Sequence, residues 1–343
     1  MRRIPFRRDP GIEQGQGSRP GIDVPPAPAH TTSAVLALFI VFLWATSWVQ
    51  IKFGLQEIPP LTFAGIRYSL AALALIGAIL LSGRMTALQS ISKGAWRKLA
   101  LLGVLLYAVT QGAVFVALSI LPAVTVNLVW SFSTIVVAWM GIAWLAEPPT
   151  SLQWLGVALA TTGTIIYFYP PSLPAGQRVG LMVAAVGVLA NAGASILGRQ
   201  GNRSGRWSPL VVTAVSMGFG AALLMAIGLA KEGVPTISLK GWAILLWLAL
   251  VNTALAFTLW NHTLRALTAV ESSVINSTML IWIPLLAWLF LGETLTRTAV
   301  AGLVLAAAGT ILVQLRRVGR PRFPGRRRAE AAAGEGRAPA SPK

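Results

Sequence analysis

The chain has 343 residues, of which 55% are hydrophobic and 11% are charged, and its formal net charge is +18. A soluble domain carries roughly 25% charged residues, so most of this chain does not face water and lipid is its main solvent. The basic residues gather in two tails and short connectors, not on a helix face with interleaved aromatics, which excludes a nucleic-acid partner. Because the chain has no cysteine, a disulfide framework, a thiolate nucleophile and a cysteine-ligated zinc site are also excluded.

Residues 1–31 are rich in Pro, Gly and Arg and cannot bury enough apolar surface to fold, so they predict a disordered cytoplasmic tail. The first apolar run begins near Thr32 and has full span length, which favours an uncleaved first helix over a secretory peptide. A bilayer core requires about 20 apolar residues per helix. Ten runs meet this requirement: 33–53, 61–82, 98–119, 123–145, 151–170, 179–198, 208–230, 241–263, 269–291 and 296–315. Residues 316–343 predict a second, basic, disordered cytoplasmic tail.

The chain repeats itself at long range. A shift of 146 residues lays the stretch from Trp96 to Ile166 on the stretch from Trp242 to Leu312 without a gap. Identical residues in the two copies include the pairs Gly156 and Gly302, Gly163 and Gly309, and Glu147 and Glu293. The sequence therefore predicts two five-helix repeats, over residues 32–170 and 178–315.

The distribution of Lys and Arg predicts the orientation of the chain, because these residues are retained on the cytoplasmic side. With both termini inside, 22 of the 28 basic residues are cytoplasmic. Five spans per copy is an odd number, so the second copy begins on the opposite side and is inverted relative to the first. Inverted repeats are typical of transporters that alternate one site between the two faces of a membrane. The predicted fold is therefore all-α and integral to the membrane, with ten transmembrane helices as two inverted five-helix repeats.

Several loose motifs occur in a specific order between about residue 34 and residue 315. They are Leu43 to Leu55 at the end of the first span, Ile58-Pro59-Pro60, Ile66-Arg67-Tyr68, Ala269 to Ser273, and Leu291-Gly292-Glu293 followed by Gly302 and Gly309. Together they resemble the EamA-type transporters of the drug/metabolite transporter superfamily. The resemblance implies a ten-helix inverted-repeat carrier of small organic metabolites, often an exporter, in the inner membrane.

The chain departs from the pattern of that family in the prolines that bend its helices. The family commonly has a proline in the ninth helix about one turn before Pro284, nearer Leu280. The first copy has no proline at Thr134 or Ala138. The bending of these helices around a cavity therefore does not follow from the resemblance.

Ionisable side chains within spans are expensive and are functional candidates by default. Lys52 and Arg67 lie near the predicted outer boundary. They either form a cationic rim that attracts an anionic or zwitterionic substrate, or extend their long side chains so that the charge reaches the lipid headgroups. Glu271 is the only carboxylate within a predicted span. Near the cytoplasmic boundary it is either a proton- or substrate-coupling group or a charge stabilised by the helix N-terminus. Glu147 and Glu293 lie in turns that lead into helices, and predict capping.

Uncharged polar groups at mid-depth are the better candidates for ligand contact. An amide in hydrocarbon needs a partner, which either a neighbouring helix or a wet cavity supplies. The predicted substrate-binding residues are Trp44, Gln111, Asn127, Asn191, Asn252 and Asn276. The repeated glycines permit close helix approach and require no ligand.

These features predict a secondary transporter, an exporter of small organic metabolites or amphipathic compounds that works by alternating access. The alternative is a lipid-linked sugar carrier or flippase on the same architecture. No HExxH pair, intramembrane carboxylate pair or GxxxxGK[ST] loop occurs, which argues against an enzyme, a metal site and an ATP-driven pump. The sequence implies no cofactor, and the expected partners are a small-molecule substrate and membrane lipids, with the chain a monomer or a homodimer.

Overall fold

The structure, a computed structural model, describes residues 30–83, 91–145, 150–169, 175–202, 209–264, 266–267 and 269–314. Every regular element within these residues is helical, as the sequence predicts. The elements are α1 (His30–Gly54), α2 (Pro60–Leu81), α4 (Lys93–Gly103), η1 (Val104–Gln111), α5 (Gly112–Ile120), α6 (Ala123–Leu145), α7 (Ser151–Tyr167), α8 (Ala175–Asn202), α9 (Pro209–Glu232), α10 (Leu239–Leu246), η2 (Trp247–Leu255), α11 (Ala256–Thr263), α12 (Ala269–Ser277), α13 (Met279–Leu291) and α14 (Arg297–Gln314).

Eight of these helical segments are long and apolar enough to cross a membrane. They are His30–Gly54, Pro60–Leu81, Lys93–Ile120, Gly176–Ser195, Leu210–Glu232, Leu239–Trp260, Val274–Leu291 and Arg297–Gln314. Each falls on one of the ten predicted runs. The other two runs correspond to α6, with 23 residues, and to the shorter α7, with 17 residues.

The helix boundaries follow local sequence signals. Pro60 occupies the first turn of α2, where its missing N–H leaves no helical hydrogen bond unmade. Thr150 and Gln153 form a capping box at the start of α7, in which each side chain accepts a hydrogen bond from the other residue's backbone N–H. Gly292 ends α13 with a φ of 65°, a left-handed conformation that glycine adopts without strain.

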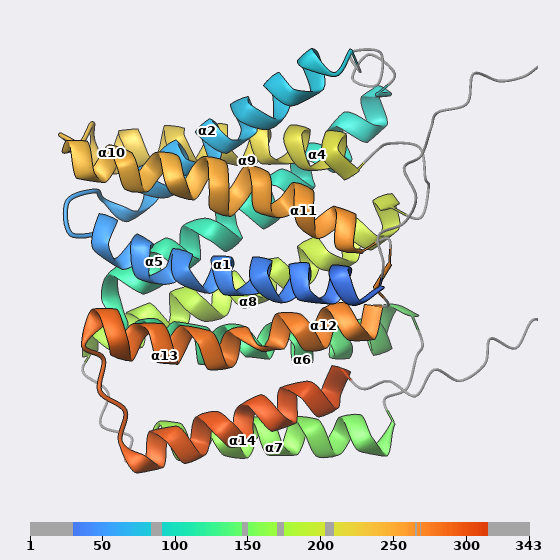
Figure 1. The fold of residues 1–343 in the computed structure, drawn as a ribbon, viewed down its shortest axis with the longest axis vertical. Helices are drawn as coiled ribbons and strands as arrows, with labels where there is room; N and C mark the ends of the chain where they lie inside the picture. The colour runs from blue at the N-terminus through green and yellow to red at the C-terminus, as the bar shows by residue number, and fades with distance from the viewer. Residues whose placement is uncertain are drawn as a thin grey trace, which may run out of the picture.

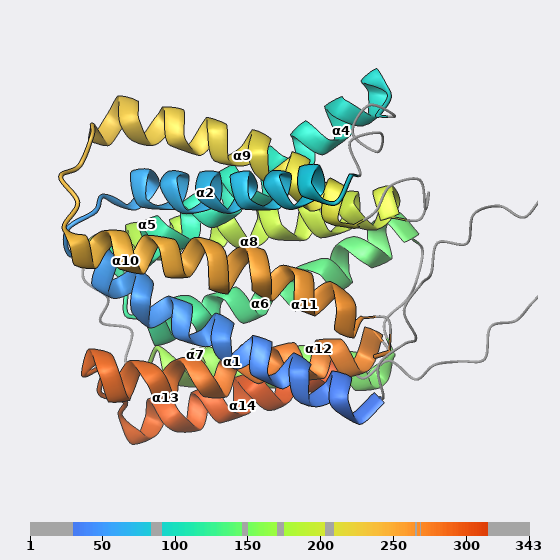
Figure 2. The ribbon, with the colours of Figure 1, turned by 45° about the horizontal axis from the view of Figure 1, so that its top comes forward.

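The helices run lengthwise beside one another, and the start of α1 and the end of α14 lie at the same end of the bundle (Figures 1 and 2). We call this end the terminal end, and the end that carries residues 55–59 and 292–296 the distal end. Two helix pairs pack closely along their length: α2 with α9, and α7 with α14. Near the centre, α1 packs on α12 and α13, while α6 packs on α8. Each of these contacts joins a helix of residues 32–170 to a helix of residues 178–315.

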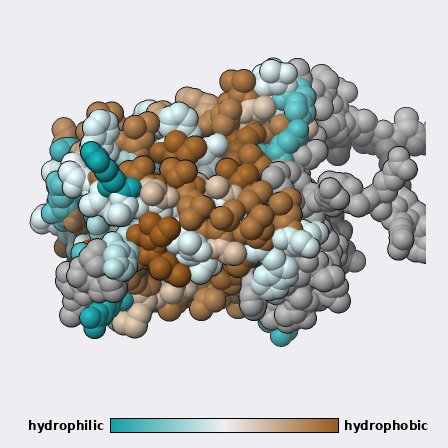
Figure 3. All heavy atoms as spheres, turned by 90° about the horizontal axis from the view of Figure 1, so that it is seen from below, coloured by the Kyte–Doolittle hydropathy of each residue, from teal (hydrophilic) through white to brown (hydrophobic). Residues whose placement is uncertain are grey.

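The outer surface suits a lipid environment. In Figure 3 a broad apolar belt occupies the middle of the visible face, and hydrophilic residues lie toward its two ends. Large aliphatic side chains are exposed in this chain, among them Leu73 and Ile165, each 65% exposed. A soluble monomer rarely leaves so much contiguous apolar surface uncovered, so lipid is expected to cover this belt.

Glycines set the close approach of α7 and α14. A Cβ atom built on Gly163 would lie 2.5 Å from the carbonyl oxygen of Gly302, and one on Gly156 would lie 2.7 Å from that of Gly309. Real Cβ atoms do not come this close to backbone atoms. The prediction that these repeated glycines are packing residues is therefore confirmed.

Two π-helical segments, η1 and η2, interrupt equivalent long helices of the two copies. A shift of 146 residues carries Val104–Gln111 onto residues 250–257, which overlap Trp247–Leu255. A third interruption, at Thr278, separates α12 from α13. Pro284 lies inside α13 instead of at this break, so the chain leaves regular helix about one and a half turns before its proline. π-Helical segments recur at functional sites, so the side chains around η1 and η2 are candidates for functional residues.

Candidate functional site

Arg67 is buried within the helix bundle and is only 5% exposed. Its Nε and one terminal nitrogen donate to Oγ1 of Thr253 at 3.2 and 3.1 Å, and its guanidinium lies 5.2 Å from the ring centre of Tyr68. The Thr253 hydroxyl in turn donates to the carbonyl oxygen of Leu248, five residues earlier in η2. Arg67 thus ties α2 of the first copy to the π-helical segment of the second.

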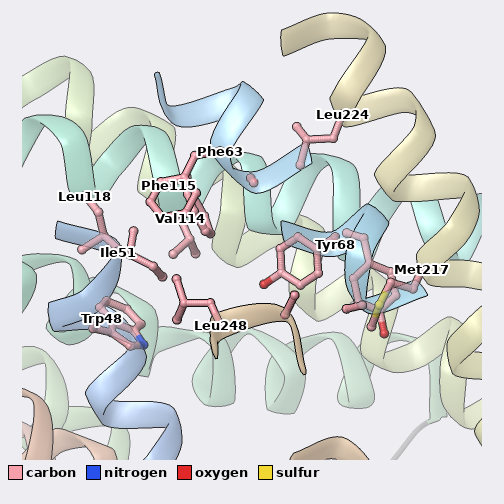
Figure 4. Packing of buried hydrophobic residues seen from close by; sticks show 14 of the residues in the cluster. Trp48, Ile51, Phe63, Tyr68, Val114, Phe115, Leu118, Met217, Leu224 and Leu248 are labelled. Atoms are coloured by element: carbon pink, nitrogen blue, oxygen red, sulfur yellow. The ribbon is translucent and has the colours of Figure 1, made fainter. Parts of the chain in front are cut away.

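This position differs from the expected cationic rim. Arg67 is seven residues into α2, about 10 Å along the helix axis, and its guanidinium lies 5.9 Å from the ring centre of Phe115 on α5. Figure 4 shows Tyr68 and Phe115 in the same packed core as Leu248. Within the described residues Arg67 has no ion pair with a carboxylate. A guanidinium that is buried without a counter-ion is costly in a membrane protein, and such residues mark functional positions.

Trp44 and Asn252 lie together at mid-depth. Trp44 Nε1 donates to the backbone oxygen of Asn252 at 3.1 Å, and Asn252 Nδ2 donates to the backbone oxygen of Leu43 at 2.7 Å. The Trp44 ring also packs on Phe257 and Trp260, with ring centres 5.3 and 5.2 Å away. Asn252 is fully buried, whereas Trp44 is half-buried. This pair joins α1 to η2.

Two further predicted amides also join the copies. Asn127 is buried on α6 and donates to the backbone oxygen of Met279 at 3.2 Å, beside the break between α12 and α13. Asn191 on α8 is half-buried and donates to the hydroxyl of Ser133 at 2.6 Å. Together with Trp44 and Asn252, four of the six predicted binding residues thus make hydrogen bonds between the two halves of the chain. In this conformation a neighbouring helix accepts the hydrogen bond of each amide nitrogen, whereas the buried Oδ1 of Asn252 has no partner among the described residues.

The remaining two predicted amides are placed differently. Gln111 is half-buried at the end of η1, and Asn276 is exposed near the end of α12, whereas Ser272, one turn earlier, is buried. Neither Gln111 nor Asn276 adds a hydrogen bond to those just described. Because Asn276 is accessible, it remains free to meet a ligand without loss of a helix–helix contact.

Alanine substitution is expected to separate these two kinds of amide. Asn252→Ala removes a buried donor to the carbonyl of Leu43, so it should destabilise the folded protein by roughly 1–3 kcal/mol and lower transport together with protein yield. Asn276→Ala should leave thermal stability unchanged and lower transport only if the amide contacts substrate. Thermal unfolding in detergent and transport per folded molecule are the two measurements. An Asn276→Ala protein with normal stability and normal transport would remove Asn276 from the site.

A cavity of about 570 Å³ lies at the distal end of the bundle. Its walls come from the ends of α1, α5, α8 and α13 and from the turns beside them. The polar side chains that line it are Lys52, Gln56, Ser119, Gln177 and Glu293, and the rest of the lining is Leu, Ile and Pro. The predicted attraction residue Lys52 is therefore beside a cavity, whereas Arg67 is not among its lining residues.

Carboxylates cap helices across the two copies at this end. Glu293 accepts hydrogen bonds from the backbone N–H groups of Ala123 and Val124 at 2.7 and 3.1 Å, so it caps α6 and not the helix that follows it. Glu232 caps α2 in the same way through Leu61 and Thr62. The role of Glu232 does not follow from the sequence, because a carboxylate at a helix end gives no signal of which distant helix it meets. Glu147 lies outside the described residues.

Glu271 lies at the terminal end, where its side chain is 40% exposed and its Oε1 is 3.0 Å from His30 Nε2. This contact joins the start of α1 to the start of α12. A side chain with this exposure is not enclosed by protein, so this conformation does not place Glu271 in a buried site. Its role in coupling remains a prediction. Within the described residues, no group of three or more His, Asp and Glu side chains is arranged to hold a metal ion.

The substitution Glu271→Gln tests coupling directly. It keeps the shape of the side chain and removes its charge change, so if Glu271 carries the coupled proton, dependence of uptake on an imposed pH gradient should be lost while substrate exchange continues. Uptake with and without a pH gradient in proteoliposomes measures this. Gradient-driven accumulation that persists in the variant would make Glu271 a helix-end charge that binds His30.

Comparison with known proteins places this arrangement among membrane transporters. The model of the EamA-like transporter family matches residues 31–169 and again residues 178–315. The chain is 27% identical to the "Uncharacterized inner membrane transporter YedA" of Escherichia coli strain K12, over 82% of this chain and 90% of that protein. It is 23% identical to the "S-adenosylmethionine/S-adenosylhomocysteine transporter" of Chlamydia trachomatis serovar L2, over 76% of this chain and 83% of that protein.

A protein of known structure has a similar fold. A solved structure described only as "Crystal structure of protein" superposes with a TM-score of 0.61 at 16% identity, covering 82% of this chain and 97% of that one. Its identity is too low to carry more than the fold. The two family matches together span most of the chain, they coincide with the two predicted copies, and eight helices are suited to cross a bilayer. The chain is a multi-pass inner-membrane transporter and belongs to the EamA-like transporter family.

Proposed function

We propose that this protein is a secondary transporter that exports small organic metabolites or amphipathic compounds by alternating access. The observation that carries the proposal is the asymmetry between the two ends of the bundle. At the distal end, helices of both copies surround a cavity of about 570 Å³. At the terminal end, His30 and Glu271 join α1 to α12. A cavity between the copies at one end, and none described at the other, is the arrangement expected of a single state of an alternating carrier.

The proposed architecture is ten membrane spans in two inverted repeats, with both termini in the cytoplasm. In support, α6 and α7 lie in the same bundle as the eight long spans, and the two closest helix pairs each contain equivalent helices of the two copies. Equivalent helices pack on each other when a two-fold axis passes between them. The start of α1 and the end of α14 lie at the same end of the bundle, as an even number of crossings requires (Figure 1).

Reporter fusions test this topology. A reporter fused after Gln177 should be active only outside the cytoplasm, and one fused after Arg317 should be active only inside, because the excess of basic residues holds the termini in the cytoplasm. Two reporters are used, one active only in the cytoplasm and one active only outside it, so that either location gives a positive signal. Two fusions on the same side would exclude the inverted arrangement.

Counterflow in proteoliposomes tests transport itself. Vesicles loaded with unlabelled amino acids, nucleosides or amphipathic cations should accumulate the matching labelled compound transiently, without ATP. Empty vesicles and vesicles that hold heat-denatured protein are the controls. A fluorescent lipid that moves between leaflets only when the protein is present, with no counterflow of soluble compounds, would favour the flippase alternative.

A further inference from the structure

The distal cavity contains one cationic and one anionic side chain, and the same short segment of backbone holds both. Lys52 Nζ donates to the carbonyl oxygens of Leu118 and Leu121, each at 2.8 Å. Glu293 accepts from the N–H groups of Ala123 and Val124. The turn between α5 and α6 therefore fixes the positions of both charges. Two charged groups held in place need little reorganisation when a ligand arrives.

Neither charged group has used its full capacity for hydrogen bonds. An ammonium group has three N–H donors, and Lys52 commits two of them to backbone oxygens. A carboxylate accepts about four hydrogen bonds, and Glu293 accepts two. Both side chains are half-buried and both line the cavity. Each can therefore still bind a group of opposite charge on a ligand.

Lys52 and Glu293 do not neutralise each other by direct contact. Among the described residues they form no ion pair with one another, although their charges interact through space. The cavity thus presents one positive group and one negative group at separate points, and their charges sum to zero. A ligand with a single charge would gain one attraction and meet one repulsion, whereas a ligand with both charges can gain two attractions.

The remaining walls combine aliphatic side chains with polar backbone groups, and more of their surface is polar than apolar. Leu55, Leu118 and Ile120 are among the aliphatic residues that line the cavity. Its volume of about 570 Å³ lies within the usual range of roughly 300–1,000 Å³ for small-molecule sites. The lining therefore suits a small molecule that carries two opposite charges, with the aliphatic residues available to contact an apolar side group.

We propose that the distal cavity is a binding site for zwitterionic small molecules, whose carboxylate pairs with Lys52 and whose cationic group pairs with Glu293. This inference rests on the proposed function, since it names the class of substrate that the transporter takes up or releases at this end. Amino acids with an apolar side chain and their cationic derivatives belong to this class.

The absence of native cysteine allows a direct binding test that needs no transport. Ser119 is an exposed residue of the cavity lining, so Ser119→Cys places a single thiol at the site. In detergent-solubilised full-length protein, the rate of labelling by a charged, water-soluble thiol reagent is measured with increasing L-phenylalanine. The two comparison probes are phenethylamine, which lacks the carboxylate, and 3-phenylpropionate, which lacks the amine. Phenylalanine should protect the thiol at concentrations at least about tenfold lower than either comparison probe, the factor expected if a second charge pair adds about 1.4 kcal/mol.

Two charge variants and a control thiol sharpen the test. In the Ser119→Cys background, Glu293→Gln should remove the advantage of phenylalanine over 3-phenylpropionate, and Lys52→Met should remove its advantage over phenethylamine. Ser82→Cys, exposed at the other end of the bundle, should be labelled at the same rate with or without each probe. Gln56→Cys, also in the cavity lining, serves as a second reporter if Ser119→Cys does not fold.

The outcomes distinguish this site from the proposed function. Equal protection by all three probes, protection by none, or stronger protection by a singly charged probe would overturn the zwitterion site. Protection that survives both charge variants in well-folded protein would overturn the roles of Lys52 and Glu293. Selective protection by phenylalanine without any counterflow would support the site and contradict the transporter.

Discussion

Replacing Gly163 by alanine is expected to destabilise the folded protein, although alanine is the better helix former. A Cβ atom at this position would lie 2.5 Å from the carbonyl oxygen of Gly302 and 3.0 Å from Cα of Ala306. These are backbone atoms, which cannot rotate away, so α7 and α14 must separate along their shared seam. Overpacking of this kind costs about 1–3 kcal/mol, and the lower melting temperature should be visible in purified protein in detergent.

A matched control exists on another membrane helix. Gly77 lies inside α2, and a Cβ atom there would meet no other heavy atom within 4 Å. Gly77→Ala should therefore gain the helix propensity of alanine, about 1 kcal/mol, and melt at the same or a higher temperature. The two identical substitutions should shift stability in opposite directions. Equal shifts would mean that α7 and α14 do not approach as closely as described.

Arg67→Met is expected to lower transport by at least about tenfold while leaving the protein as stable as before or more stable. Methionine removes a buried charge that has no carboxylate partner among the described residues, and replacing such a charge with an apolar side chain often stabilises a fold. It also removes both hydrogen bonds to Thr253, and with them the link between α2 and η2. Melting temperature and counterflow per folded molecule are measured on the same preparation.

Two further variants separate charge from geometry at this position. Arg67→Lys keeps the charge but loses the planar pair of donors to Thr253 and the stacking on Tyr68, so it should restore little transport. Thr253→Val removes the shared acceptor and keeps the volume. Full transport by Arg67→Met in a protein that melts much earlier would instead make Arg67 a packing residue of the core.

The hydrogen bonds around these residues show that the two halves of the chain are not separate bodies. Asn127, Asn191, Asn252 and Arg67 each bond to the opposite half. The alternating motion proposed above would therefore have to break some of these bonds or carry the bonded helices together. Variants that remove one of them are expected to change the balance between conformations as well as stability.

The amino-acid sequence by itself determined the class of this protein and the plan of its helices. Apolar runs long enough to cross a bilayer identify the helices of this chain. In hydrocarbon every backbone N–H and C=O needs a partner within the protein, and a single apolar segment meets this need only as a helix. The gapless repeat of Trp96 to Ile166 on Trp242 to Leu312 predicted two copies, and the family matches coincide with them. Gly156, Gly163, Gly302 and Gly309 were recognisable as packing residues, because a glycine repeated on one helix face has little other use in lipid.

Only the tertiary structure decided which polar groups meet. Arg67 was expected at a membrane boundary, and its burial depends on Tyr68, Phe115 and Thr253, two of which lie far away in the sequence. Glu293 was expected to cap a helix, but the helix it caps, α6, begins 170 residues earlier in the chain. The partner of a side chain depends on how the helices rotate and pack, and the period of an almost wholly apolar helix does not record which face turns inward. The cavity shared by Lys52 and Glu293 likewise exists only where helices of both copies converge.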